Sequence, residues 1–468
     1  MDTSDTLLLA RAQFGLNIAF HILFPTITIG LAWILVYFRA QYARTGEPAW
    51  LETYRLWVKV FALTFAMGVV TGIVMSFQFG TNWPGFMLKV GNIAGPLLAF
   101  EVLTAFFLEA TFLGVMLFGW SRVPPWLHVT SAVLVAVGTL MSSFWIISAN
   151  SWMQFPAGHV VRDGIAYPAD WLAAIFNPTF GWRLAHMVTA AYLTTAFVVM
   201  AVGARYLLAG RFDDHARTML RMGVAMAAVL APLQLVIGDQ HGLDVAAYQP
   251  AKLAAIEGHW NGEEPAALVL FAVPNEAAAR NDYAVSIPRG ASLVITHSLD
   301  GRFRGLNDFA PEDRPPVALP FFAFRVMVGI GFAMIALALW GAWLWWRGRL
   351  DGSRAFLRLA ALSWPAGFIA LLAGWTVTEV GRQPWLAAGI LRTGDAASPV
   401  EAGAVAATLV LFVVVYAVVF AAGILYMNRL IHRGPTGEAV AVEGLASRPI
   451  SAAEGAGRRV FGGKGAAP

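Results

Sequence analysis

Six side chains that can bind a metal or carry a proton lie in, or at the end of, long apolar stretches of this chain. They are His21, Glu101, Glu109, His186, Met327 and Glu379. Ionisable groups are costly inside a membrane, so each is a candidate metal ligand, ion ligand or proton carrier. The chain has no Cys, which excludes disulfides, thiolate metal sites and iron–sulfur clusters. Any bound metal must therefore use His, Met or carboxylate ligands.

The apolar stretches that carry these residues predict an all-α polytopic membrane protein. Only 13% of the residues are charged and 58% are hydrophobic, whereas soluble domains carry roughly 25% charge. A spanning helix needs about 20 mostly apolar residues. Nine segments qualify: 14–38, 57–80, 94–119, 127–149, 184–208, 217–237, 320–345, 357–377 and 402–428. The acidic start and the long first stretch argue against a cleaved signal peptide.

The basic residues of the connections predict the orientation of these helices. Most Arg and Lys residues follow the odd-numbered spans, which places the N-terminus in the periplasm and the C-terminus in the cytoplasm. The predicted parts are helices 1–6 in 1–237, a periplasmic loop at 238–319, helices 7–9 in 320–430 and a flexible cytoplasmic tail at 431–468. No basic cluster with interleaved aromatics points to nucleic acid as a partner.

The possible iron ligands share a similar expected depth in the membrane. At 1.5 Å per residue, His21 and Glu101 each lie roughly 10 Å below the outer start of their spans. The five possible ligands are expected in one layer near the outer surface: His21, Glu101, His186, Met327 and Glu379. Scattered structural residues would not be expected to align in this way. Glu109 follows Glu101 by eight residues, close to the same helix face and nearer mid-membrane.

Each candidate has a structural alternative. A lone His in a membrane helix can be a hydrogen-bonded structural residue, and Met327 can be core packing. Glu379 precedes Arg382 by three residues, and the two can form an ion pair. Glu101 and Glu109 can bond to neighbouring helices. In the long hydrophilic connection, Glu257 can be a solvated loop carboxylate.

A run of unusual residues at the end of the eighth predicted span carries a family resemblance. Gly381-Arg382-Gln383-Pro384-Trp385, preceded by Gly374-Trp375 and Thr378-Glu379, resembles the GRQPW signature of cytochrome bd oxidase subunit I. Further motifs agree, in the family's order: Arg11-Ala12-Gln13-Phe14 with His21; Glu101 and Glu109; Ala149-Asn150-Ser151-Trp152-Met153-Gln154; Trp182-Arg183 with His186; Lys252-Leu253-Ala254-Ala255-Ile256-Glu257; and Phe324-Arg325-Val326-Met327-Val328-Gly329. The resemblance covers nearly the whole chain.

The resemblance implies haem ligands at the matching positions. His186 and Met327 would ligate a low-spin haem b, and a six-coordinate His/Met iron suits electron transfer rather than oxygen binding. His21, Glu101 and Glu379 would serve two high-spin haems, with the assignment between them open. The implied cofactors are two haems b, one low-spin and b558-like and one high-spin and b595-like, with a haem d or a further haem b.

The resemblance also implies roles for residues around the haems. Lys252 and Glu257 would line a quinol site, and Glu109 would pass protons from the cytoplasmic side. Trp375 and Arg382 would support the haem cluster, with Arg382 pairing a haem propionate. The loop of about 80 residues has no long insertion after Glu257, which resembles the short-loop subgroup that includes the cyanide-insensitive quinol oxidases.

The function implied is that of the catalytic subunit of a quinol:oxygen oxidoreductase in the bacterial inner membrane. One-electron haem centres would join a two-electron quinol to oxygen, and uptake of protons from inside would build a gradient without a pump. The expected partners are subunit II and, as is common in the family, a small third subunit with a single helix. One rival is a cofactor-free transporter that uses the buried carboxylates. A dihaem anchor is a second rival, disfavoured because such anchors usually use paired His ligands within helices, and only two His lie convincingly at spans here, on different helices.

Overall fold

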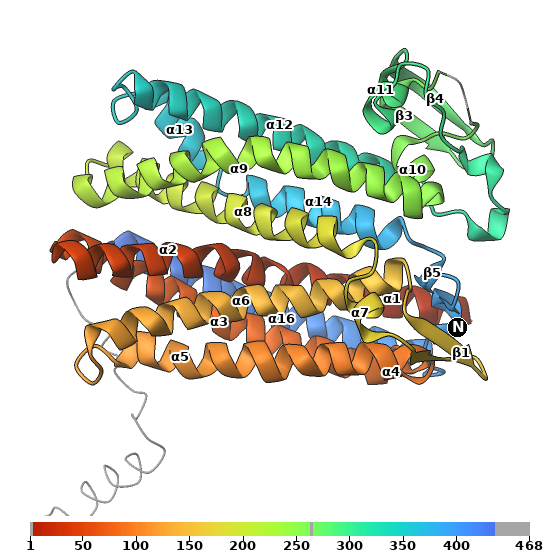
Figure 1. Ribbon diagram of the computed structural model, residues 1–468, viewed down its shortest axis with the longest axis horizontal. Coiled ribbons are helices and arrows are strands. Elements are labelled where there is room, and N and C mark those ends of the chain that lie inside the picture. The colour runs from red at the N-terminus through yellow and green to blue at the C-terminus, as the bar shows by residue number, and fades with distance from the viewer. Residues whose placement is uncertain (1–2, 263–264, 436–468) are drawn as a thin grey trace, which may run out of the picture.

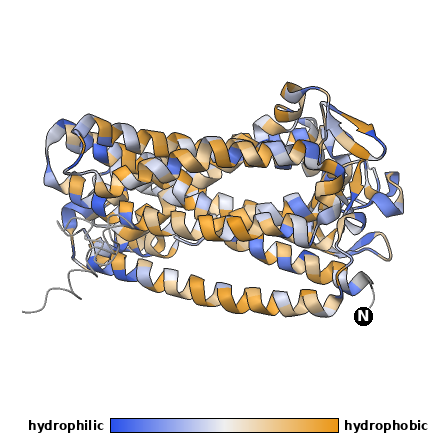
Figure 2. Ribbon diagram, turned by 90° about the horizontal axis from the view of Figure 1, so that it is seen from below, coloured by the Kyte–Doolittle hydropathy of each residue, from blue (hydrophilic) through white to orange (hydrophobic). Residues whose placement is uncertain are grey.

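The computed structural model describes residues 3–262 and 265–435, and these form a bundle of long helices (Figure 1). Residues from 436 onward, most of the predicted flexible tail, lie outside the described part. Hydrophobic residues dominate the middle of the long helices, and hydrophilic residues gather at the two ends (Figure 2). This distribution is the one expected of helices that cross a bilayer.

The first span is broken at a position that concerns the site. Helix α1 (Thr3–His21) ends directly at His21, and α2 (Leu23–Thr45) continues after Ile22. Pro25 explains the break, because it has no N–H to donate to the carbonyl of His21 and its ring crowds that carbonyl. The two helices together form a single candidate span from Asp5 to Thr45.

The other long helices follow the predicted order. In the first half they are α3 (Pro48–Thr81), α4 (Pro84–Glu101), η1 (Val102–Phe106), α5 (Phe107–Phe118), α6 (Pro125–Gln154), α8 (Phe180–Leu208) and α9 (Asp213–Tyr248). In the second half they are α12 (Ala318–Trp346), α13 (Arg354–Leu362), α14 (Ala366–Val380) and α16 (Ala402–Arg433). Proline opens α3, α4 and α6, the helix position where its missing N–H costs nothing.

The predicted number of spans is confirmed within the described residues. Eight helices are long and apolar enough to cross a membrane, and α13 and α14, bent by 40°, make a ninth if counted as one span. The chain is thus a mostly helical polytopic membrane protein, as the composition indicated. Several helices run beyond the predicted apolar stretches: α4 starts at Pro84 rather than near 94, and α9 continues to Tyr248 rather than ending near 237.

The short elements collect at one end of the bundle, next to the N-terminus (Figure 1). The strands form three antiparallel hairpins: β1 (His159–Arg162) with β2 (Ile165–Pro168), β3 (Leu268–Asn275) with β4 (Arg280–Ile287), and β5 (Trp385–Ala387) with β6 (Leu391–Arg392). The short helices there are α7 (Trp171–Ile175), α10 (Pro250–Glu257), α11 (Gly290–Thr296), η2 (Leu306–Asp308), η3 (Pro311–Asp313) and α15 (Thr393–Ala396). We call this end the loop end.

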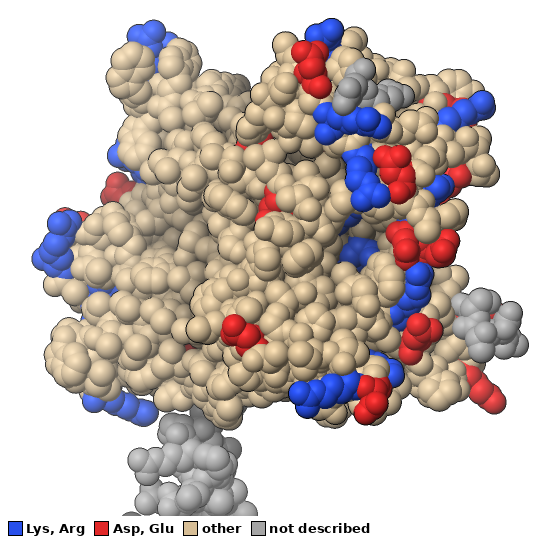
Figure 3. Space-filling model, turned by 45° about the vertical axis from the view of Figure 1, so that its right-hand side comes forward, with Lys and Arg blue, Asp and Glu red and all other residues tan. Residues whose placement is uncertain are grey.

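Charge follows the same division. Lys, Arg, Asp and Glu side chains gather at the loop end and at the opposite rim, while the flank of the bundle between them is almost free of charge (Figure 3). Large apolar side chains of α12 and α16 are exposed on such surfaces, among them Val326, Phe332, Val410 and Val418. An uncharged flank of this kind fits a lipid or protein neighbour rather than water.

Candidate functional site

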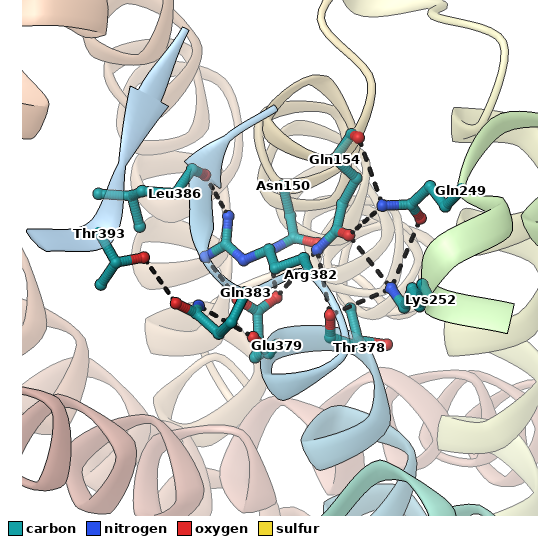
Figure 4. Close-up of polar contacts among 10 residues, drawn as sticks. All are labelled: Asn150, Gln154, Gln249, Lys252, Thr378, Glu379, Arg382, Gln383, Leu386 and Thr393. Atoms are coloured by element: carbon teal, nitrogen blue, oxygen red, sulfur yellow. Dashed lines mark hydrogen bonds and ion pairs between the residues drawn. The ribbon is translucent and has the colours of Figure 1, made fainter. Parts of the chain in front are cut away.

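Lys252, on the short helix α10, is buried and bonded to two of the spanning helices (Figure 4). Its Nζ donates to Oε1 of Gln154 on α6 at 3.1 Å and to the carbonyl of Thr378 on α14 at 3.1 Å. A longer bond of 3.5 Å reaches Oε1 of Gln249. Burial lowers the pKa of Lys252 well below its usual range, helped by the nearby Arg183 and opposed by Glu379. This amine is therefore biased towards its neutral form.

Glu379 and Arg382 bind each other directly beside this lysine (Figure 4). Arg382 Nη2 lies 2.5 Å from Glu379 Oε2, and Asn150 Nδ2 donates to Glu379 Oε1 at 2.9 Å. Gln154 reaches the same carboxylate oxygen at 3.5 Å, so one glutamine joins Lys252 to Glu379. The ion pair considered from the sequence is thus present. Arg382 Nε is buried without a hydrogen-bond partner among the described residues, which leaves it a donor for another group.

Glu257 is buried as well, so the alternative of a solvated loop carboxylate is wrong. The residue is 4% exposed, and its Oε2 lies 3.8 Å from Arg325 Nη2. Burial raises the pKa of Glu257, and the Arg325 guanidinium partly offsets that rise. A carboxylate with a raised pKa, close to a cationic partner, is suited to general-base work near neutral pH.

Arg325 is a residue whose role the sequence did not reveal, although it lies inside a recognised motif. Its guanidinium donates to the carbonyls of Val269 on β3, Ile256 on α10 and Phe321 on α12. It also lies 3.4 Å from the centre of the Phe321 ring. Arg325 therefore ties the helix that carries Glu257 and the β3–β4 hairpin to α12, two residues before Met327.

His186 lies in the first turns of α8 and packs against α9. Its Nδ1 is buried and has no hydrogen-bond partner among the described residues. Its ring centre lies 5.3 Å from that of His241, and a Cβ at Gly238 would lie 3.5 Å from its Cε1. The expectation of only two His at the spans is too low, because His241 also belongs to α9. Polar residues at 239–241 interrupt the apolar run and hid this extension of the helix.

Met327 meets α14 at a glycine. A Cβ at Gly374 would lie only 2.8 Å from Met327 Sδ, so any larger residue there would displace the thioether. Trp375 follows this glycine and is half-buried. The small residue lets α12 and α14 approach closely at the level of the sulfur.

His21 is held against α3. Its Nδ1 lies 3.0 Å from Thr71 Oγ1, and a Cβ at Gly72 would lie 3.1 Å from its Cε1. The hydrogen bond at Nδ1 fixes the orientation of the ring, as ligand histidines commonly require. His21 also stands where Pro25 ends the first helix, so its backbone position is set by that break.

Glu101 and Glu109 both face α6, one beside Ser142 and the other beside Gly138. Ser142 Oγ donates to Glu101 Oε1 at 2.8 Å, and a Cβ at Gly138 would lie 2.6 Å from Glu109 Cγ. The π-helical turn η1 lies between the two carboxylates. It holds about one residue more than an α-helical turn, so eight residues span two turns and both side chains reach the same face.

The positions along α6 correct the expected depth of Glu101. Ser142 lies eight residues, about 12 Å, from Asn150, the partner of Glu379. It also stands near the middle of α6. Glu101 is therefore deeper than a layer at the outer surface, because α4 begins ten residues before the predicted span. His186, Met327 and Glu379 lie nearer the loop end of their helices, whereas His21, the last residue of α1, lies 16 residues into the span that starts at Asp5.

The candidate ligands are single side chains on separate helices. Within residues 3–262 and 265–435, no three His, Asp or Glu side chains come together as a site for a lone metal ion. Hydrogen bonds and ion pairs join Lys252, Glu379 and Arg382 into one network, whereas His21 and Glu101 bond to Thr71 and Ser142 instead. Such an arrangement suits a flat cofactor that supplies most of its own coordination, as haem does.

Comparisons with known proteins agree with this architecture. Residues 9–435 match the family model described as cytochrome bd terminal oxidase subunit I. The chain is 31% identical to the bd oxidase structure from Geobacillus thermodenitrificans, with a TM-score of 0.85, and the match covers 92% of this chain and 100% of that one.

Two curated relatives match at the same level of identity. The cytochrome bd-II ubiquinol oxidase subunit 1 of Escherichia coli (strain K12) is 35% identical over 502 residues, covering 92% of this chain and 97% of that protein. The cytochrome bd ubiquinol oxidase subunit 1 of Bacillus subtilis (strain 168) is 35% identical over 441 residues, covering 92% and 94%. The chain therefore belongs to the cytochrome bd terminal oxidase subunit I family and is a membrane-embedded subunit of an oxygen-reducing terminal oxidase.

Proposed function

We propose that this chain is the catalytic, haem-bearing subunit of a quinol:oxygen oxidoreductase. Quinol is oxidised at the loop end, and oxygen is reduced to water with protons from the opposite side. The observation that carries the proposal is the buried network that runs from Lys252 through Gln154 to Glu379 and Arg382 (Figure 4). It connects the helix expected to bind quinol to the segment expected to hold haem.

The residues present fit haem groups. His186 offers a buried Nδ1 without a partner among the described residues, and Arg382 offers a buried Nε in the same state. We propose His186 and Met327 as the ligands of a low-spin haem b, and His21, Glu101 and Glu379 as residues that serve two high-spin haems, one b and one d or b. Bound there, haem iron supplies the one-electron steps that link quinol to oxygen. Trp375 and Arg382 support this cluster, Arg382 through charge-assisted bonds to a propionate.

Quinol would bind between α10 and the ends of α6 and α14. Oxidation of two quinols releases four electrons and four protons, and reduction of one oxygen consumes four of each to give two waters. Glu257 accepts a quinol proton at its carboxylate, which the buried position and the Arg325 guanidinium hold in place. Lys252, biased towards the neutral amine by burial, contributes a polar contact without requiring a counter-charge.

Protons for water formation would travel along α6. Glu109 beside Gly138 and Glu101 beside Ser142 succeed each other on one face of that helix. Replacement of Glu109 with Leu should abolish most quinol-driven oxygen uptake while the haem spectrum is kept. Glu47→Leu, at an exposed turn, is the matched control. Full turnover of Glu109→Leu with all haems bound would remove this residue from the proton route.

The orientation and the division of the chain remain part of the proposal. We propose a periplasmic N-terminus and a cytoplasmic C-terminus, helices 1–6 in 1–237, a periplasmic quinol-binding loop at 238–319 that opens with the end of α9 and helix α10, helices 7–9 in 320–430, and a cytoplasmic tail at 431–468. The lengths of the alignments support membership of the short-loop subgroup. The same 92% of this chain aligns over 502 residues with the Escherichia coli relative but over 441 with the Bacillus subtilis one, so the longer alignment contains more residues that this chain lacks.

The proposed partners follow from the subunit character of the chain. We propose subunit II and a small single-helix subunit as neighbours in the bacterial inner membrane, against the uncharged flank of the bundle (Figure 3). The relatives are named ubiquinol oxidases and, at 29% identity, a putative menaquinol oxidase. Both are quinols, and the quinol-binding residues proposed here serve either.

A reduced-minus-oxidised spectrum of the purified oxidase, with pyridine haemochrome analysis and quinol-dependent oxygen uptake, tests the proposal as a whole. We expect b-type bands, a third haem of type d or b, and oxygen uptake that requires quinol. A colourless, correctly assembled preparation would favour a transporter that uses the buried carboxylates. Haem without oxygen uptake would contradict the proposed catalytic role.

A further inference from the structure

A row of buried amide side chains runs between α1, α3 and α16, from the loop end towards His21. It consists of Gln13 and Asn17 on α1, Gln78 on α3, and Asn82 at the end of α3, and we call it the amide seam. Gln13, Asn17 and His21 succeed each other at intervals of four residues, so they share one face of α1. Three uncharged amides at 0–3% exposure are unusual in membrane helices that could be entirely apolar.

The register of the two helices is fixed at both ends of the seam. Asn82 Nδ2 donates to Gln13 Oε1 at 2.9 Å at the outer end, and His21 Nδ1 meets Thr71 Oγ1 at 3.0 Å at the inner end. From the first contact, Asn17 lies one turn inward on α1 and Gln78 one turn inward on α3, about 6 Å in each case. The two amides therefore stand at the same level on neighbouring helices.

The described residues leave three polar atoms of these two amides without a hydrogen-bond partner. Tyr416 Oη donates to Asn17 Oδ1 at 2.6 Å, but Asn17 Nδ2 has no partner among the described residues. Both Nε2 and Oε1 of Gln78 are also buried without one. Buried polar atoms are almost always hydrogen-bonded, either to protein or to water. Two donors and one acceptor at one level provide the partners that an internal water requires.

We propose that the amide seam is a hydrated route between the outer surface at Asn82 and the site beside His21, and that water formed from oxygen leaves through it. The seam contains no carboxylate, Lys or His between Gln13 and His21, so it offers hydrogen bonds to water without a group that titrates. This distinguishes it from the carboxylates beside α6. The assignment of the product rests on the function proposed above, but the hydration of the seam does not.

Hydroxyl-radical footprinting of the intact oxidase by X-ray radiolysis tests the hydration, because buried side chains are labelled only where bound water lies beside them. Tyr416 and Tyr206 are a matched pair: they are 5% and 4% exposed, and each hydroxyl donates to a protein oxygen, Asn17 Oδ1 and the carbonyl of Ile431. We expect Tyr416 to be labelled several-fold faster than Tyr206. Equal labelling of the two tyrosines would show a dry seam and overturn the proposal.

A substitution that closes the seam tests whether water passes through it during turnover or only occupies it. Gln78→Leu keeps the volume and removes both orphaned atoms, and Gln41→Leu, on the surface of α2, is the control. We expect Gln78→Leu to lower Tyr416 labelling to the Tyr206 level and to lower maximal oxygen uptake several-fold, with an unchanged haem spectrum. Reduced labelling with unchanged turnover would overturn the exit role.

Two further arms keep the outcome interpretable. Asn17→Leu provides a second closure of the same seam if Gln78→Leu does not assemble, and its labelling is judged by the same comparison. Footprinting of the unaltered protein needs neither haem nor turnover. A colourless protein with a strongly labelled Tyr416 would therefore contradict the proposed function while the hydrated seam stands.

Discussion

Lys252 Nζ donates to the backbone carbonyl of Thr378, at 3.1 Å, so the helix expected to bind quinol is bonded to the residue that directly precedes Glu379. The contact is buried, and it joins segments that are 126 residues apart in the chain. Because the partner is a backbone atom, side-chain changes at Thr378 leave this acceptor in place. The lysine is the side of the contact that a mutation can remove.

Lys252→Met keeps the length of the side chain and removes its three donated bonds. We expect weaker quinol binding and a loss of roughly tenfold or more in kcat/KM, since an orphaned buried acceptor costs about 1–3 kcal/mol. Steady-state oxygen uptake against quinol concentration measures the effect, and Lys89→Met, at a half-buried position on α4, is the control. Unchanged kinetics in Lys252→Met would show that the network does not serve quinol.

Glu257 should make the rate of quinol oxidation fall at acid pH, which gives the pH profile an acid limb. Its pKa is raised by burial, so the protonated form persists to higher pH, and the base is lost as pH falls through that raised pKa. We expect the rate to rise with pH over this window in the unaltered protein. In Glu257→Gln the limb should disappear and the rate should fall about 10²–10⁴-fold. A pH profile of quinol oxidation decides, with Glu312→Gln as the control; an identical profile in Glu257→Gln would exclude the base role.

Gly374→Ala places a methyl group 2.8 Å from Met327 Sδ. The thioether must move, and because a thioether ligand raises the haem potential, we expect a lower midpoint potential and an altered low-spin band. Gly329→Ala, two residues after Met327, has open space around its Cβ and serves as the control. Redox titration followed by visible absorption checks the result. If Gly374→Ala and Gly329→Ala titrate alike, Met327 does not ligate the low-spin haem.

Gly138→Ala tests the carboxylate route without altering a carboxylate. The added Cβ would lie 2.6 Å from Glu109 Cγ and displace the side chain, at a cost of about 1–3 kcal/mol in stability. We expect slower oxygen uptake with normal haem content. Gly114→Ala, with nothing near its Cβ, should behave like the unaltered protein. Normal turnover in Gly138→Ala would indicate that Glu109 tolerates displacement or does not carry protons.

The sequence predicted the helices well because backbone groups in lipid must form hydrogen bonds within the protein, along the whole chain. Long apolar segments must be helical, and their number and order could be read directly. The ends of the helices could not be read in the same way. Near Pro84 and Tyr248 the helices continue beyond the apolar region, where packing and local bonding rather than hydropathy determine the limit.

The site was predictable as residue types but not as contacts. The motifs gave Lys252, Glu379, Arg382 and Gln154, but not the bonds that join them, because Gln154 lies 98 residues before Lys252. Burial of Glu257 was hidden for the same reason, since Arg325 comes from a helix that starts after the loop. The π-helical turn between Glu101 and Glu109 leaves no hydrophobic pattern by which it could be found.

That turn compensates for one extra residue between the two acids. Seven residues of ordinary α-helix advance by about 700°, close to two full turns, and the π-helical turn absorbs the eighth residue without rotating Glu109 away from Glu101. An ordinary α-helix over the same eight residues would rotate Glu109 by about 80° relative to Glu101. Deletion of one residue from 102–106 would instead restore the α-helix and keep the two acids within about 20° of one face.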